Sequence, residues 1–122
     1  MTKPNEWIVF DYESDMASDL IRAMLSDWFH AISSNLRNAI VESLVLHTRI
    51  LCDILLNGYQ KDDIKLEHLL PGFTSANLTK LKQEYGDNKT VGSPCWQFNK
   101  MLAHPTTHRS ISHDYSIALN TL

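Results

Sequence analysis

One segment of this chain, residues 35–56, is apolar around most of its helical circumference, and this restricts the fold more than any other feature. At about 100° per residue, its large apolar side chains fall within a sector of about 100°. These side chains are Leu36, Ile40, Leu44, Leu51 and Leu55, and the sector is widened by Val41, Val45 and Cys52. The polar residues form one narrow stripe, which consists of Asn35, Asn38, Glu42, Arg49 and Asp53. Such a helix is buried by several partner helices or by a second subunit, so we predict a central helix that ends at Asn57-Gly58.

The flanking segments also have helical periodicity, and the fold class that we predict is all-α. Apolar residues at three- and four-residue spacing predict a first helix from about Ser14 to Ser33. A third helix is predicted over Ser75–Tyr85, ended by Gly86, after a loop over 58–76 with a short helical turn. Ser93-Pro94 is typical of a helix start and predicts a fourth helix that reaches His104. The expected architecture is an up-and-down bundle of four main helices, with a short fifth helix near the end of the chain as an option.

The length of 122 residues predicts one domain, residues 1–122, with an N-terminal arm over residues 1–12. The apolar stretch Trp7-Ile8-Val9-Phe10 is interpreted as a small strand or an extended arm. Two roles stay open for the arm, packing on its own core or completing a neighbouring subunit. Together with the apolar central helix, the arm leads us to expect a homodimer.

The charge of the chain excludes some classes of partner. A net charge of −3 argues against strong non-specific binding to nucleic acid or to anionic membranes, although a local basic patch remains compatible with it. The most apolar stretch, residues 40–56, is too short and too charged to span a bilayer. Cys52 and Cys95 do not form a Cys-x-x-Cys pair and are interpreted as reduced, buried thiols. We therefore expect a cytoplasmic protein without a cofactor.

The first candidate cluster lies on the predicted central helix. His47 falls in the middle of its apolar face, where each ring nitrogen needs a hydrogen-bond partner. His47 is therefore either a core histidine bonded to another helix or part of a site. Glu42, Arg49 and Asp53 share the polar stripe. They form either a solvated face with a weak ion pair or a charge network that faces a groove or a dimer partner.

The second candidate cluster is the densest polar group in the chain, residues 99–109. Lys100 and His104 share a helix face at i, i+4 spacing, and Thr106, Thr107 and Arg109 add donors suited to a phosphate. The alternative is a purely structural role, as a capped helix end with exposed polar groups. His104 and His108 also have metal-ligand spacing, with His47 as a third ligand, although Pro105 disfavours a continuous helix between them.

Both clusters resemble motifs of a family of short bacterial helical proteins without an assigned function. The first match is Glu42-Ser-Leu-Val-Leu-His47-Thr-Arg49-Ile-Leu-Cys-Asp53, where the family has Glu followed by His-x-Arg. The second match is Asn99-Lys100-Met-Leu-Ala-His104-Pro-Thr-Thr-His108-Arg109, where the family has Asn-Lys, then Ala-His and an Arg. The resemblance covers roughly residues 35–110, and only these two motifs are specific.

The same motifs more distantly resemble the HEPN superfamily of helical bundles, many of which dimerise and many of which cleave RNA as toxins or defence proteins. Active members carry an Arg and a polar residue a few positions before a His. Here Asn99 stands where that Arg is expected, and Arg109-Ser-Ile-Ser-His113 has one spacer too few. The departure puts ribonuclease activity in doubt.

Three functions remain as expectations. The first is a non-enzymatic HEPN-like binding or interaction module with a polar groove for RNA, a nucleotide or a protein. Its groove residues are drawn from both clusters, with Glu42, His47, Arg49, Asp53, Asn99 and Arg109 as binding residues. The second is a metal-independent ribonuclease, in which Lys100 supplies positive charge and His104 acts as general acid or base. The third is a metal-binding bundle that uses His47, His104 and His108.

Overall fold

The computed structural model describes residues 5–56, 64–87 and 89–99. These residues form an all-α helical bundle and contain no strand. Its helices are α1 (Asn5–Met24), α2 (Asp27–Ala31), α3 (Ser34–Leu56), α4 (Leu66–Leu69), α5 (Ala76–Tyr85) and α6 (Pro94–Gln97). The predicted fold class is thereby confirmed. None of the helices in the described segments combines the length and the apolar character that a membrane span requires.

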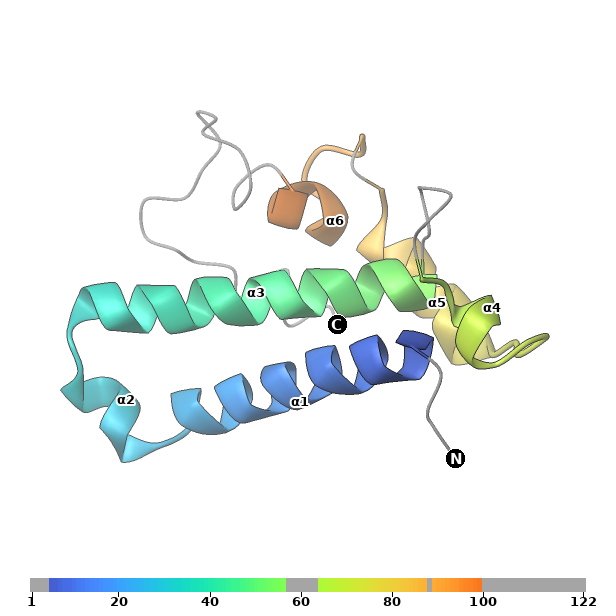
Figure 1. The fold of residues 1–122 in the computed structure, drawn as a ribbon. Helices are drawn as coiled ribbons and strands as arrows, with labels where there is room; N and C mark the ends of the chain where they lie inside the picture. Colours follow the sequence, from blue (N-terminus) through green and yellow to red (C-terminus); the bar gives the residue numbers. More distant parts are fainter. Residues whose placement is uncertain (1–4, 57–63, 88, 100–122) are drawn as a thin grey trace.

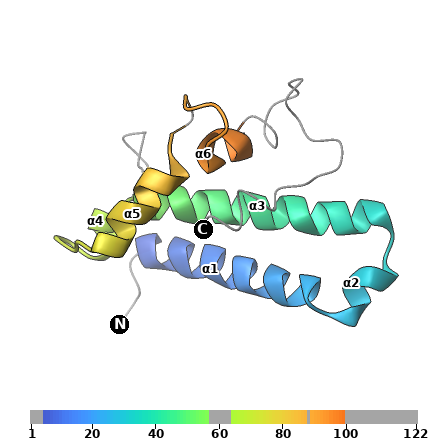
Figure 2. The same ribbon diagram turned by 180° about the vertical axis from the view of Figure 1, so that it is seen from behind.

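The two longest helices, α1 and α3, lie side by side and antiparallel, and α2 forms the corner between them (Figure 1). The short helices α4 and α5 gather at the far end of α3, and α6 lies over α3 on the side away from α1 (Figure 2). The helix α3 therefore has α1 on one side and α5 and α6 on the other. This is the central position that its all-round apolar sequence predicts.

The prediction of an extended N-terminal arm over residues 1–12 is wrong for residues 5–12, which belong to α1. The β-branched and aromatic residues Trp7-Ile8-Val9-Phe10 have a local preference for strands, but they are helical here, within a helix that packs against α3. Trp7 and Phe10 are one helical turn apart and make an edge-to-face contact with ring centroids 5.9 Å apart. Ser14, interpreted as the helix start, lies inside α1.

The prediction of one continuous helix from Ser14 to Ser33 is wrong in a second respect, because α1 ends at Met24. Ser26 has an extended backbone (φ −87°, ψ 155°), and its hydroxyl donates to the carbonyl oxygen of Ala23 at 2.6 Å. This side-chain bond to the backbone competes with continued helix, so the chain turns and α2 begins at Asp27. The apolar periodicity runs through the break and conceals it.

The other predicted boundaries agree with the described helices. The central helix, predicted from residue 35, begins at Ser34, and the Ser33 hydroxyl accepts a hydrogen bond from the backbone N–H of Leu36. Ser75 and Ser93 cap α5 and α6 in the same way, and Gly86 ends α5. The predicted stop at Asn57-Gly58, the extension of the fourth helix to His104 and the optional fifth helix lie outside the described residues.

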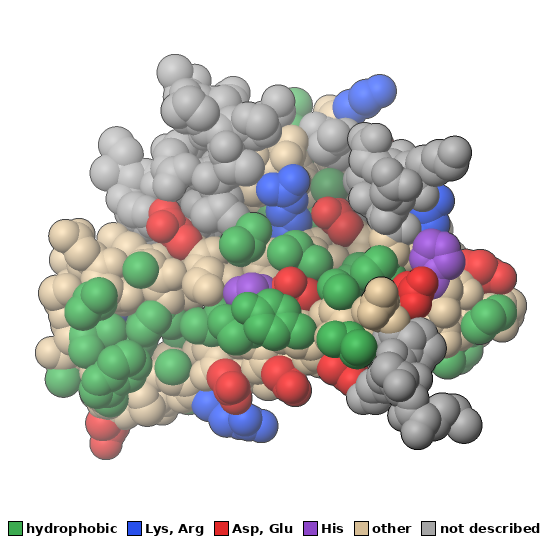
Figure 3. All heavy atoms as spheres, viewed as in Figure 1, with side chains coloured by type: hydrophobic (Ala, Val, Ile, Leu, Met, Phe, Trp, Pro, Cys, Tyr) green, Lys and Arg blue, Asp and Glu red, His purple; other side chains and the backbone are tan. Residues whose placement is uncertain are grey.

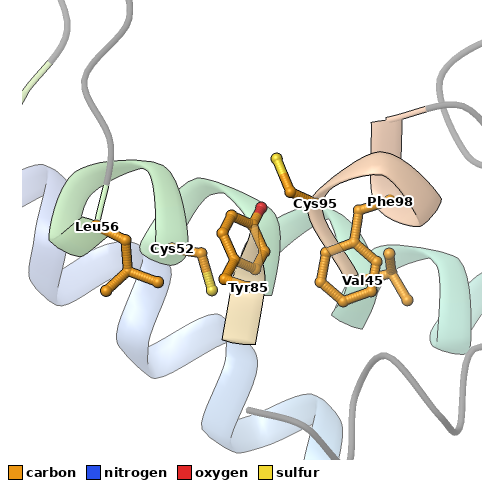
Figure 4. Packing of buried hydrophobic residues seen from close by; sticks show 6 residues of the cluster. All are labelled: Val45, Cys52, Leu56, Tyr85, Cys95 and Phe98. Carbon is orange, nitrogen blue, oxygen red and sulfur yellow. The ribbon is translucent and has the colours of Figure 1, made fainter. Parts of the chain in front are cut away.

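The main core lies between α3, α5 and α6 (Figure 4). Tyr85 at the end of α5 packs against Phe98, with ring centroids 6.2 Å apart, and both side chains are fully buried. The cluster is completed on α3 and α6 by Val45, Cys52, Leu56 and Cys95. Neither Cys52 nor Cys95 forms a disulfide and both are buried, as expected from their apolar surroundings. This core fixes one side of α3, and α1 covers another.

Candidate functional site

The first candidate residue, His47, is buried at the interface between α3 and α1. Its Nδ1 forms a hydrogen bond with Oε2 of Glu13, and both side chains are about one-tenth exposed. The ring of Tyr12 meets the imidazole edge-to-face, with centroids 6.0 Å apart. His47 is thus a core histidine bonded to another helix, which was one of the two interpretations of its sequence position. Glu13 gave no sequence signal of its own, because one acidic residue among several on α1 does not reveal a buried partner 34 positions away.

The polar stripe of α3 does not share a face with His47. Arg49 follows His47 by two residues, which places the two side chains about 200° apart around the helix. Glu42 and Arg49 are seven residues apart, so they fall within about 20° of each other. Glu42, Arg49 and Asp53 are all half-buried. The structure therefore groups Glu42 with Arg49 and Asp53, as the sequence predicts, and separates all three from His47.

Most of the second cluster lies outside the described residues. Asn99 is half-buried and lies two residues beyond the end of α6. Lys100, His104, His108 and Arg109 lie beyond the last described position, so the ribonuclease hypothesis and the polar groove remain predictions. In the segments that the structure describes, no three His, Cys, Asp or Glu side chains gather as metal ligands. The three-histidine site needs His104 and His108, and it too remains a prediction.

An apolar groove lies where α1, α2 and α3 meet, and the sequence did not predict it. The groove has a volume of about 330 Å³ and is lined by Leu20, Trp28, Ile32, Leu36, Ala39, Ile40 and Ser43. Small-molecule pockets commonly have volumes of about 300–1,000 Å³, so the groove has room for a few apolar side chains. Leu36 belongs to the apolar sector of the predicted central helix, and Trp28 belongs to the apolar repeat of the predicted first helix. The sequence therefore led us to expect both side chains in the core.

Large apolar side chains face solvent on the walls of this groove and around the connection between α1 and α2. Trp28 and Leu36 are each 56% exposed, and Leu25, between α1 and α2, is 82% exposed. Ile21 on the last turn of α1 is also exposed. Figure 3 shows the corresponding gathering of hydrophobic side chains over the end of the molecule where α2 joins the two long helices. Proteins in water seldom leave contiguous apolar surface without a binding role. The end of the molecule where α2 joins α1 and α3 is therefore a candidate interface.

The buried Cys52 thiol is not a candidate for nucleophilic chemistry. Burial, the neighbouring Asp53 carboxylate and Cys95 together raise the pKa of the Cys52 thiol from 9.0 to about 12. Reactive cysteines need the opposite shift, because the thiolate is the nucleophile. Burial likewise raises the pKa of Tyr85, with further contributions from both cysteines.

The comparisons with known proteins add no family to this geometry. No model of a known protein family, no curated protein and no solved structure matches this chain. The groove and the Glu13–His47 pair must therefore be judged on their own chemistry.

Proposed function

We propose that this chain is a non-enzymatic protein-interaction module, and that its binding surface is the apolar groove between α1, α2 and α3. The observation that carries the proposal is the solvent exposure of Trp28 and Leu36 on the walls of a preformed groove. Tryptophan is the residue type most enriched among the side chains that dominate binding energy at protein interfaces. An exposed Trp beside a groove is thus a better anchor for a partner than for this chain's own core.

The occupant that we propose is an amphipathic helix of a different protein. Three helices border the groove, and an apolar helix face that inserts into such a groove does so through side chains at i, i+3, i+4 and i+7. Ser43 is the single hydroxyl-bearing side chain among the lining residues. A lining so poor in polar groups favours apolar side chains over a nucleotide or RNA base, which needs several donors and acceptors.

A binding titration tests the proposal. The probe is a fluorescently labelled helical peptide with leucines at i, i+3, i+4 and i+7 and glutamines elsewhere, titrated with the full chain and followed by anisotropy. We expect saturable binding that Trp28→Ser and Leu36→Ser each weaken at least about tenfold, since each removes an exposed apolar anchor. Val91→Ser is the matched control, because Val91 is 74% exposed but does not line the groove.

Sedimentation of the same proteins identifies the competing occupant, a second copy of this chain. If the chain is a dimer that Leu36→Ser dissociates, the groove is a dimer interface and the proposal of a different partner is wrong. The proposal is also wrong if the peptide fails to bind or binds the Trp28→Ser protein as tightly as the unmodified one.

A further inference from the structure

We infer that the partner helix is basic, with lysine or arginine side chains on both flanks of its apolar face. This inference rests on the proposed function and adds the charge of the partner.

The two helices on one side of the groove are strongly acidic. Residues 5–31, which contain α1 and α2, hold six acidic residues and one basic residue, Arg22. Asp19 directly precedes the groove residue Leu20, and Asp27 directly precedes Trp28. The side chains of Asp15, Asp19 and Asp27 are all exposed. Acidic side chains flank the apolar area along α1 and below α2 in Figure 3.

The basic side chains of this region are already engaged. Arg22 donates to Oδ1 of Asp19 at 3.0 Å, so it offsets one carboxylate of the six. Arg37, in the second turn of α3, donates to the carbonyl oxygen of Ile32 at 2.9 Å and more weakly to that of His30. Arg37 therefore fastens the turn between α2 and α3 while it keeps its positive charge. With both arginines counted, residues 5–43 hold seven acidic and two basic residues, so this part of the molecule keeps an excess of negative charge.

This charge distribution favours a basic partner over a second copy of the chain. Two copies related by a two-fold axis would bring their acidic α1–α2 surfaces toward one another, and like charges across an interface oppose association. A helix with basic flanks would instead place its cations toward Asp19 and Asp27, which adjoin groove residues, while its apolar face fills the groove. Such exposed pairs act mainly on the association rate and are weakened by salt.

Three versions of the peptide probe test the inference. They share the same leucines and carry lysine, glutamine or glutamate at the flanking positions. At low ionic strength we expect the lysine peptide to bind about tenfold tighter than the glutamine peptide, and the glutamate peptide to bind more weakly than either. In about 1 M salt the lysine and glutamine peptides should converge, because screening then acts within a few ångströms.

Charge-neutralised variants locate the effect. The double variant Asp19→Asn and Asp27→Asn should lose most of the preference for the lysine peptide and keep its affinity for the glutamine peptide. Glu84→Gln, which removes an exposed carboxylate on α5, should change neither. If the glutamine peptide binds at the groove and the lysine peptide binds no tighter, the inference is overturned while the proposed function stands. If no peptide binds, the proposed function itself fails.

Discussion

Glu13 and His47 join the two longest helices of this protein through one buried hydrogen bond, between the carboxylate on α1 and Nδ1 of the imidazole on α3. A buried carboxylate and a buried imidazole are each costly to desolvate, and each is tolerated here because the other is its partner. With Nδ1 bound to Glu13, only Nε2 of His47 could serve another group. The pair therefore serves first to fix how α1 packs on α3.

We predict that Glu13→Ala destabilises the protein by about 3 kcal/mol, because it leaves the His47 ring buried without the partner of its Nδ1. Glu13→Gln retains an oxygen acceptor of the same shape and should cost less. The free energy of unfolding, measured by urea denaturation with circular dichroism, checks both values. The double variant Glu13→Leu and His47→Leu removes both polar groups, and we expect it to be much closer to the unmodified protein than Glu13→Ala is. Equal losses in the single and double variants would contradict a coupled pair.

The Cys52 thiol should make stability depend on pH only in the alkaline range. Its pKa is raised from 9.0 to about 12 in the folded protein. Well below pH 9 the thiol is neutral in both states and the free energy of unfolding is unaffected by it. As the pH rises above 9 the unfolded chain loses the proton first, so stability falls until about pH 12. Cys52→Ala should flatten this decline between pH 9 and 10.5 compared with the unmodified protein, and a decline of unchanged slope would contradict the assignment. The raised pKa of Tyr85 acts in the same direction and remains in both proteins.

The sequence predicts the helices best where one strong local signal defines each end. Ser75, Ser93 and Gly86 place the boundaries of α5 and α6 because caps act through neighbouring backbone groups. The start of α1 could not be predicted in this way. Its first two turns include β-branched and aromatic residues, and the helix that contains them packs against α3, which is a tertiary effect.

The candidate surfaces are harder to predict than the helices. The position of His47 on an apolar helix face indicated that it needs a buried partner, but nothing local indicated Glu13. The groove depends on the turn at Ser26, which directs α2 away from the line of α1 and leaves Trp28 on its wall. If the first helix continued to Ser33, as its apolar periodicity predicts, Trp28 would lie in the core. The groove could therefore not be found without knowledge of the turn.

Tyr85→Phe should leave the protein as stable as before or stabilise it by about 1 kcal/mol. The Tyr85 side chain is fully buried, and its hydroxyl has no hydrogen-bond partner within the part of the chain that the structure describes. The hydroxyl lies near the Cys95 sulfur in Figure 4, and sulfur is a weak acceptor. Removing the hydroxyl therefore removes a desolvation cost and keeps the ring contact with Phe98. Urea denaturation checks this, with Tyr12→Phe as a control because Tyr12 is exposed. A loss above about 1 kcal/mol for Tyr85→Phe alone would show that the hydroxyl has a partner worth keeping.

Among the glycines that the structure describes, Gly86 is the one that we expect to tolerate substitution least. Its φ of +73° lies in the left-handed region, and a methyl group at this position would lie 2.6 Å from the Cβ of Ser93. Ser93 cannot move freely, because its hydroxyl donates to the carbonyl oxygen of Asp87 and accepts from the N–H of Trp96. Gly72 is the matched control, since its φ of +74° is nearly the same and no atom lies within 4 Å of the position its Cβ would take. Gly72→Ala should therefore cost only the backbone strain, about 1 kcal/mol, and Gly86→Ala should cost at least about 2 kcal/mol by thermal or urea unfolding. Equal losses at the two sites would mean that the α5–α6 connection yields to the methyl group, and that the close approach of Gly86 to Ser93 contributes nothing to stability.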